Sequence, residues 1–295
     1  MGYFEIPEPD YDRYSNRQLA AIPLVVLAIS LAILAGWWVV FGVPVNAGID
    51  FTGGSELTIE TTDSADDVEA AFDEEPVSVQ AVPGEDDRYI VQFTSTDLEA
   101  LNDQANANLE PLPGADGVVV ADMTTSAAFG SQQAQMALFG LVIAFIGMSA
   151  LAFVLFRTFV PSIAIVVSAF SDMMIPLAFM NLTGLELSLG TVAALLMIIG
   201  YSVDSDILLN NHILRRGGAS FYENTYRAMQ TGVTMTVTSM VAMLVMATTA
   251  WFFGVDLLFA IGLILFVGLC ADLMNTYMLN LSLLRWYKLE RVGQQ

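Results

Sequence analysis

Six long runs of apolar residues dominate the chain, and a region of alternating polar and apolar positions separates the first run from the other five. Each run is close to the roughly 20 residues that an α-helix needs to cross the hydrocarbon of a bilayer. The pattern therefore predicts a polytopic α-helical membrane protein with six transmembrane helices. We expect these spans at residues 19–42, 134–156, 161–181, 187–213, 231–253 and 256–286.

The region 46–130 has the pattern of a folded domain outside the membrane. Alternation typical of strands occurs at 55–61, 77–82, 88–93 and 117–123, and helical spacing occurs at 65–74 and 97–109. The order βαββαβ predicts a ferredoxin-like α+β fold, in which two helices cover one face of an antiparallel sheet. Thr96 and Glu99 have the spacing of a capping box at the second helix. No nucleophile, base and orienting residue are grouped in this region, so we expect binding or scaffolding and no enzymatic activity.

Charge is distributed unevenly along the chain. The region 46–130 contains 19 acidic residues against one basic residue, Arg88, which argues against nucleic acid as a partner because phosphate binding needs a basic surface. The other basic residues gather on the side that holds both termini, and basic residues concentrate in cytosolic loops. We therefore expect cytosolic segments at 1–18, 214–230 and 287–295, and an extracytosolic acidic domain. Helical spacing around Phe221 and Tyr222 predicts a short helix along the inner membrane surface.

Composition also limits the chemistry. A single cysteine and a single histidine exclude an intrachain disulfide and a histidine-based metal site. The chain has no phosphate-binding loop of the type GxxxxGK[ST], so we do not expect it to handle ATP. We expect no metal and no cofactor.

Four aspartates lie inside the apolar runs: Asp172, Asp204, Asp206 and Asp272. An ionised carboxylate at mid-membrane costs roughly 2.5–3.5 kcal/mol on insertion scales, so we expect these groups to be partnered, protonated or exposed to water in a polar pathway. Together with Arg227, which precedes the fifth span, they form a candidate relay for protons or other ions.

The fourth span carries most of these polar groups. Ser202, Asp206 and Asn210 recur every four residues and predict a polar stripe on one helix face. Asp204 is turned by about 200° from Asp206, so the two carboxylates should face different neighbours. Gly200 allows another helix to approach closely. Asn211, and Asn275 in the sixth span, join the set of candidate packing residues, and the alternative interpretation is that the whole set only holds helices together or contacts lipid headgroups.

Two segments and the overall topology resemble the SecF family of protein-export membrane subunits. The segments are GIDFTGG after the first span and IGYSVDSDILL in the fourth, combined with one βαββαβ domain and six spans. The topology is similar to half of an RND-type transporter. The acid excess and the use of arginine in place of lysine also resemble haloarchaeal proteins. The resemblance assigns Asp50, Gly53 and Gly54 to the family motif that follows the first span.

The resemblance implies a subunit in the lipid bilayer that works with SecD at the Sec translocon channel and promotes export of an unfolded polypeptide, with coupling to an ion gradient. The aspartate of the bacterial pattern falls at Ser205, between Asp204 and Asp206, so the identity of the essential aspartate stays open. Two other functions remain: an RND-type exporter of lipids or small hydrophobic molecules, and a structural assembly factor whose carboxylates pair with a partner subunit.

Overall fold

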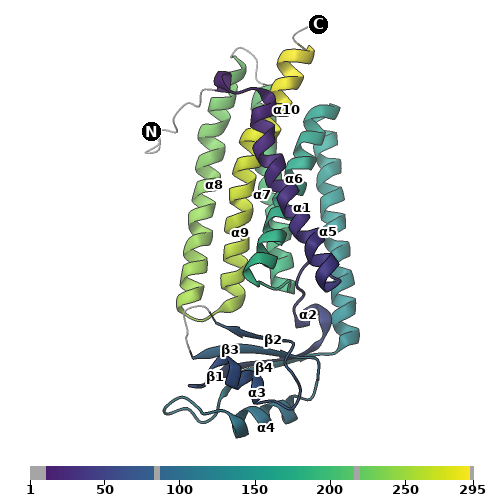
Figure 1. Ribbon diagram of the computed structural model, residues 1–295. Coiled ribbons are helices and arrows are strands. Elements are labelled where there is room, and N and C mark those ends of the chain that lie inside the picture. Colours follow the sequence, from purple (N-terminus) through teal and green to yellow (C-terminus); the bar gives the residue numbers. More distant parts are fainter. Residues whose placement is uncertain (1–10, 83–86, 216–219, 293–295) are drawn as a thin grey trace.

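The computed structural model describes residues 11–82, 87–215 and 220–292. Six helices are long and apolar enough to cross a membrane, and they form a bundle with a small α/β domain at one end (Figure 1). Five are α1 (Asn16–Phe41), α5 (Ala127–Phe156), α6 (Phe159–Thr183), α7 (Leu189–Arg215) and α8 (Phe221–Phe252). The sixth runs through α9 (Asp256–Met274), η2 (Asn275–Asn280), α10 (Leu281–Arg285) and η3 (Trp286–Val292). The prediction of six apolar spans is confirmed.

The α/β domain contains β1 (Gly54–Glu60), α3 (Ala65–Ala70), β2 (Ser78–Ala81), β3 (Arg88–Phe93), α4 (Leu98–Asn108) and β4 (Val119–Thr125). The strands form one sheet in the order β2-β3-β1-β4, and every neighbouring pair is antiparallel. This arrangement is the predicted ferredoxin-like fold. A short helix, α2 (Ile49–Thr52), leads from α1 into the sheet.

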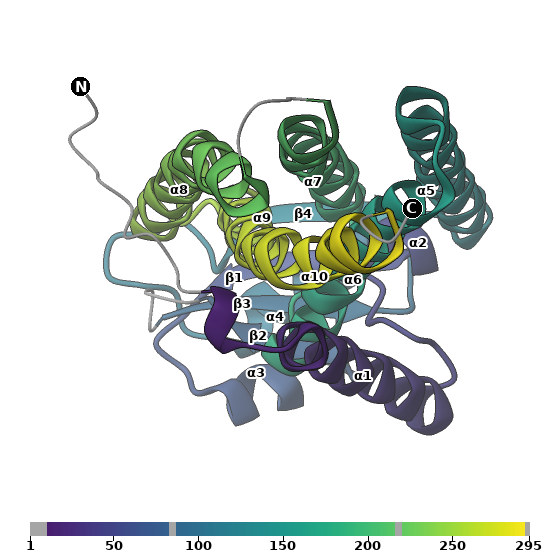
Figure 2. The same ribbon diagram turned by 90° about the horizontal axis from the view of Figure 1, so that it is seen from above.

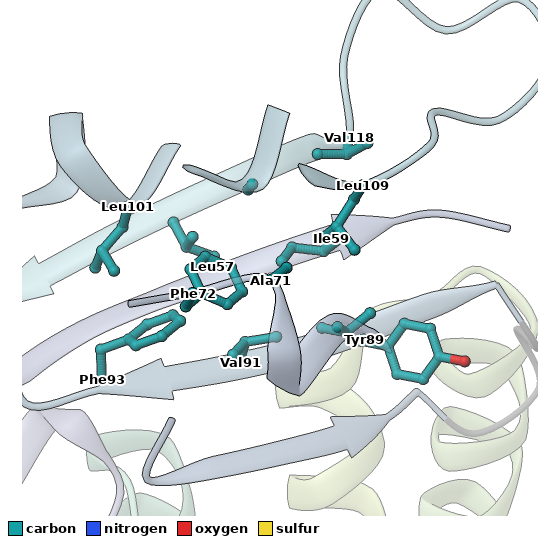
Figure 3. Packing of buried hydrophobic residues seen from close by; sticks show 12 residues of the cluster. Leu57, Ile59, Ala71, Phe72, Tyr89, Val91, Phe93, Leu101, Leu109 and Val118 are labelled. Carbon is teal, nitrogen blue, oxygen red and sulfur yellow. The ribbon is translucent and has the colours of Figure 1, made fainter. Parts of the chain in front are cut away.

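The core of this domain lies between the sheet and the helices α3 and α4 (Figure 3). Leu57 and Ile59 of β1 and Val91 and Phe93 of β3 are at most 1% exposed, because alternate residues of a strand point to the same face. Phe72 packs edge-on against Phe93 with 4.6 Å between ring centroids. Full burial of such a side chain contributes roughly 1.5–3 kcal/mol, so the domain has its own modest core.

Two details of the domain differ from the sequence prediction. The helix α3 ends at Ala70 and not at 74, because the acidic run 73–75 would place negative charge at the helix C-terminus and leads into Pro76, before which the helical conformation is disfavoured. The predicted capping box at Thr96 is wrong. Asp97 caps α4 instead, since its carboxylate accepts the Ala100 N–H at 3.2 Å and also interacts favourably with the helix dipole.

Two membrane helices are longer than their predicted spans. The helix α5 begins at Ala127, inside the region assigned to the outer domain, because Ser126 caps it by accepting the Phe129 N–H. The segment expected to be a separate surface helix forms the first turns of α8, which Ser220 caps. Gly232 lies inside the continuous helix α8, where a Cβ would overlap the Tyr277 hydroxyl of the sixth span.

The helices are arranged so that α9 and α6 lie inside the bundle, α1 lies on one side, and α7 lies on the opposite edge between α5 and α8 (Figure 2). Glycines permit the close contacts of α9. A Cβ at Gly262 would lie 3.0 Å from Ala247 of α8, and Gly268 faces Ile198 of α7 with no room for a side chain. Both described ends of the chain lie at the end of the bundle remote from the sheet (Figure 1).

The motif residues after α1 join the domain to the bundle. Gly53 and Gly54 have φ values of 75° and 119°, and a Cβ at Gly54 would overlap the Phe93 carbonyl oxygen. Asp50 Oδ2 accepts the backbone N–H of Leu189 at 3.0 Å, at the first residue of α7. The motif therefore connects β1, β3 and the start of α7, which accounts for its glycines and its carboxylate structurally.

Candidate functional site: a buried carboxylate cluster

Three of the four predicted aspartates converge in the middle of the bundle. Asp172 of α6 and Asp206 of α7 are 0% exposed, and Asp272 of α9 is 1% exposed. The cluster lies where α6, α7 and α9 pack against one another. Residues separated by up to 100 positions in sequence thus form one polar centre inside an apolar bundle.

Hydroxyl and amide groups are the hydrogen-bond donors to Asp172. Its Oδ2 accepts from Ser202 Oγ at 2.5 Å, and its Oδ1 accepts from Asn275 Nδ2 at 2.6 Å. The Asp172 carboxylate therefore links α6 to α7 and to the sixth span.

Asp206 and Asp272 share one donor. Asp206 Oδ1 accepts from Asn280 Nδ2 at 2.7 Å and from Thr276 Oγ1 at 2.9 Å. Asp272 Oδ1 accepts from Ser205 Oγ at 2.7 Å and lies 3.2 Å from the same Thr276 Oγ1. Thr276 is consequently the bridge between the two carboxyl groups.

A hydroxyl group carries only one proton, so Thr276 cannot donate to both carboxylates at once. Both contacts are satisfied when one carboxyl group is protonated. Protonated Asp272 can donate to Thr276 Oγ1, and the Thr276 hydroxyl can then donate to Asp206 Oδ1. The geometry accommodates one excess proton and a path for its transfer between the two aspartates.

The helical polar stripe of α7 faces this cluster. Ser202, Asp206 and Asn210 are each 0% exposed. Asn210 Nδ2 donates to the Asp206 carbonyl oxygen at 2.8 Å and lies 3.4 Å from Asn280 Oδ1. The four-residue spacing thus placed all three residues on one inward face, as the sequence predicted.

The sixth span presents its polar groups from the π-helical segment η2. Asn275, Thr276 and Asn280 of this segment are all 0% exposed and contact the carboxylates. Single π-helical turns inside α-helices occur frequently at functional sites. Here the wider turn directs both asparagines, five residues apart, into the same polar centre.

Asp204 lies apart from the cluster. It is exposed on the outer side of α7, and no hydrogen bond or ion pair involves it within the part of the chain that the structure describes. The sequence prediction that Asp204 and Asp206 face different neighbours agrees with this arrangement. Asn211 is partly buried near Leu155 and Phe156 of α5, where it lines a small hollow.

Arg227 does not contact the cluster. Its Nη2 lies 2.7 Å from Glu223 Oε1, one turn earlier on α8, and its side chain is 56% exposed. Within residues 11–82, 87–215 and 220–292, no ion pair with arginine or lysine reaches the three buried carboxylates. The described surroundings of the cluster therefore supply hydrogen bonds but no neutralising cation.

Three buried polar atoms near the cluster have no hydrogen-bond partner among the described residues: Asn210 Oδ1, Asn275 Oδ1 and Ser171 Oγ. Unpaired polar groups in an apolar interior are costly. The described residues therefore do not fully satisfy the polar atoms around this cluster.

Sequence reasoning missed Ser205 and Asn280 as members of the site. Asn280 follows Asp272 and Thr276 at intervals of four residues, and this spacing was a usable signal. The family resemblance placed the bacterial aspartate at Ser205, but periodicity did not predict the hydrogen bond of Ser205 to Asp272, because that contact depends on how α7 and α9 pack.

The fold and the site together define a class: a multi-pass membrane protein with an outer ferredoxin-like domain and a carboxylate cluster in its bundle. Residues 110–290 match the model of the family "Protein export membrane protein SecD/SecF, C-terminal", and residues 38–65 match the "SecD/SecF GG Motif". The second match contains Asp50, Gly53 and Gly54.

Full-length relatives identify the family. The chain is 58% identical to the protein-export membrane protein SecF of Haloferax volcanii, over 99% of both chains. It is 41% identical to the protein of the same name from Methanolacinia petrolearia, over 97% of this chain and 98% of the relative. The chain belongs to the SecF family, as the sequence resemblance predicted.

A solved structure shares the fold. The crystal structure of SecDF, a translocon-associated membrane protein from Thermus thermophilus, matches with a TM-score of 0.74 at 21% identity. The match covers 96% of this chain but 39% of that longer chain, so about three-fifths of the SecDF chain has no counterpart here.

Proposed function

We propose that this chain is an accessory subunit of Sec protein export that works with a SecD-type subunit at the translocon and assists the passage of unfolded polypeptides. The observation that carries this function is the relationship to SecF proteins over 99% of both chains. The role is non-enzymatic. The family assignment favours this function over the exporter of lipids or small hydrophobic molecules.

The proposed orientation has both termini in the cytosol and the acidic domain outside the cell. The distribution of basic residues supports it, because such residues concentrate in cytosolic loops. Arg157 is the C-cap residue of α5, Arg227 lies in the second turn of α8 and Arg285 lies near the end of the last span, all at the end of the bundle remote from the sheet (Figure 1).

In the proposed mechanism, Asp206 and Asp272 bind and release one proton through Thr276. Asp172 accepts a hydrogen bond from Ser202 of α7, so a movement of α7 changes the surroundings of Asp172. Loss of the shared proton would leave adjacent buried carboxylates charged, and their repulsion would favour a different packing of α7 against α9. Moving one charge across the membrane supplies about 2.3 kcal/mol per 100 mV, which is enough to bias such an equilibrium. Asp204 and Arg227 stay candidates for the outer steps of this relay.

The test is secretion of a reporter protein in cells whose own gene is replaced by Asp206→Asn or Asp272→Asn. Asp103→Asn, on the exposed side of α4, is the matched control. We expect export to fall about fivefold or more in the first two variants, with normal membrane levels and an intact SecD-type complex.

Two outcomes would count against the relay. Unchanged export at normal protein levels would show that the carboxylates are not used for coupling. A loss of export that merely follows loss of the SecD-type subunit would assign them a structural role.

A further inference from the structure

The outer domain has an open strand edge at β2. In the described part of the chain β2 pairs only with β3, at one end of the strand order β2-β3-β1-β4. Val82 N–H donates to the Arg88 carbonyl oxygen at 2.9 Å, and the backbone groups of an antiparallel strand alternate in direction. The N–H and C=O groups of Val79 and Ala81 therefore point to the open edge. Such an edge is a template for pairing with another extended chain.

A pocket of about 430 Å³ adjoins the beginning of this strand. Trp37 and Phe41, in the last turns of α1, form an apolar wall of the pocket, and their ring centroids are 4.4 Å apart. Val77, which precedes β2 and is 67% exposed, also lines it. Figure 2 shows β2 on the side of the sheet that lies toward α1. The pocket therefore lies between the end of a membrane helix and the open edge of the sheet.

The pleat of the sheet decides which side chains of an added strand would reach this pocket. Ser78 of β2 and Gln92 of β3 are paired in register, lie on the face of the sheet opposite its core and line the pocket. A strand beside β2 would lie about 4.8 Å from it, and every second side chain would point to that same face. The β2 backbone can thus hold an extended chain while one side chain of that chain enters the pocket.

Carboxylates determine which charge the pocket accepts. Glu186 lines the pocket, and Gln92 Nε2 donates to Glu186 Oε2 at 2.6 Å and to Glu56 Oε2 at 3.0 Å. Burial raises the pKa of both glutamates, and the nearby charges of Asp50 and, for Glu56, Asp256 add to the rise. Within residues 11–82, 87–215 and 220–292, no ion pair with lysine or arginine reaches either glutamate. A cationic side chain is the complement of this pocket.

Lipid and a second copy of this chain are poor occupants. An acyl chain would place the Glu186 carboxylate and the Gln92 amide against hydrocarbon, and a lipid phosphate would face two carboxylates. The outer domain of a second copy would bring more negative charge, since the region 46–130 has 19 acidic residues and one basic residue. An extended segment with a basic side chain satisfies both the open backbone edge and the carboxylates.

We propose that the open edge of β2 and the adjoining pocket bind an extended segment of the polypeptide in transit, whose lysine or arginine side chain lies along Trp37 and reaches Glu186. This inference rests on the proposed function and names the place where the outer domain holds its client. Backbone hydrogen bonds of an added strand supply affinity for any sequence, while the pocket supplies specificity. The aromatic wall and the carboxylate both favour a cation.

Binding of synthetic peptides to the whole purified chain in detergent micelles tests the site. The probe is a fluorescent peptide of alternating valine and threonine with one central arginine. One matched peptide has glutamate in place of arginine, and another has N-methyl groups on its backbone amides, so that it cannot join a sheet. We expect fluorescence anisotropy to show binding of the arginine peptide and binding about tenfold weaker or less for the other two. Equal affinity for the arginine and glutamate peptides, no effect of N-methylation, or no binding of the arginine peptide would overturn the proposal.

Variants of the chain separate the pocket from the strand edge. Glu186→Gln and Trp37→Ala should each weaken binding of the arginine peptide about fivefold or more, and Glu186→Gln should also reduce the preference for arginine over glutamate. Trp38→Ala is the matched control, because Trp38 is 63% exposed and does not line the pocket. Ala81→Pro removes an outward N–H, a position where an edge strand tolerates proline, and should weaken binding of both charged peptides alike. Equal binding by the variants at 37 and 38 would contradict the pocket assignment.

Photo-crosslinking in cells identifies the occupant. A photoreactive amino acid replaces Val77 beside the pocket, or Asp103 on the exposed side of α4 as a control. During export of a tagged reporter, position 77 should give an adduct with the reporter and position 103 should give none. Adducts from position 77 only with lipid, with a second copy of this chain or with the SecD-type subunit would overturn the proposal.

The site and the proposed function can fail separately. If the arginine peptide does not bind while the unaltered chain associates with the SecD-type subunit and supports export, the site is wrong and the proposed function stands. If the unaltered chain neither associates with that subunit nor affects export, the proposed function is wrong, and the assignment of a polypeptide in transit to this site falls with it.

Discussion

Thr276 is the single side chain on which the proton path depends, because its hydroxyl contacts both Asp206 and Asp272. We expect Thr276→Val to abolish transfer between the two carboxyl groups with little change in side-chain volume. Export should fall about fivefold or more. Thr276→Ser, which keeps a hydroxyl, should retain most activity. Equal export by the valine and serine variants would contradict a role for the hydroxyl group.

The stability of the outer domain depends on Gly54, since its backbone has φ 119° and its α-carbon faces the Phe93 carbonyl oxygen. Gly54→Ala should destabilise the domain by about 2 kcal/mol or more, through backbone strain and the displaced β3 strand. Thermal unfolding in detergent measures the change. Gly36→Ala in α1 should have no such cost, because the added methyl group meets no other atom and alanine favours the helix.

The sequence predicted some site residues and not others for a clear physical reason. The inward face shared by Ser202, Asp206 and Asn210 follows from helical periodicity alone. The partners of these residues depend on how separate helices pack, and periodicity carries no information about packing. This is why the contact of Ser205 with Asp272 was missed, and why Arg227 was counted in the candidate relay although it pairs with Glu223.

Among the elements, helix existence was predictable and helix ends were not. The apolar runs were sufficient to identify all six spans. The caps at Ser126 and Ser220 lengthen α5 and α8 into regions whose polarity suggested a domain edge and a surface helix. The π-helical segment η2 had no sequence signature, although it determines how Asn275 and Asn280 reach the cluster.

The contact between α8 and α9 gives a prediction at the level of elements. A Cβ at Gly262 would lie 3.0 Å from the Ala247 nitrogen and the Met243 carbonyl oxygen, both backbone atoms that cannot move aside independently. Gly262→Leu should force the helices apart at a cost of about 1–3 kcal/mol and lower the unfolding temperature in detergent. Gly147→Leu, on an exposed face of α5 with no atom near its Cβ, is the matched control. Equal unfolding temperatures for the two variants would contradict tight packing at Gly262.

For the whole molecule, the relation between the outer domain and the bundle depends on a small set of polar contacts. Gln92 Nε2, on the face of the sheet opposite its core, donates to Glu186 Oε2 at 2.6 Å and to Glu56 Oε2 at 3.0 Å. Glu186 lies in the loop between α6 and α7, outside the membrane spans. Since α7 also carries Asp206 and its start is held by Asp50, a change in the packing of α7 can reach the outer domain through this loop.

This contact predicts a pH dependence of stability. Burial raises the pKa of Glu186 above its ordinary value of 4.5, Gln92 opposes this by hydrogen bonding, and the nearby Glu56 charge adds to the rise. A carboxyl group with a raised pKa in the folded state contributes stability below its ordinary pKa and loses it as pH rises through the raised value. Glu186→Gln should therefore unfold at a higher temperature than the unaltered protein at pH 7, and the difference should disappear toward pH 4.5. Glu69→Gln, on the exposed side of α3, tests for a general effect of removing charge from this acidic domain. If Glu69→Gln gives the same pH-dependent gain, net charge and not the buried Glu186 contact controls how the domain is held on the bundle.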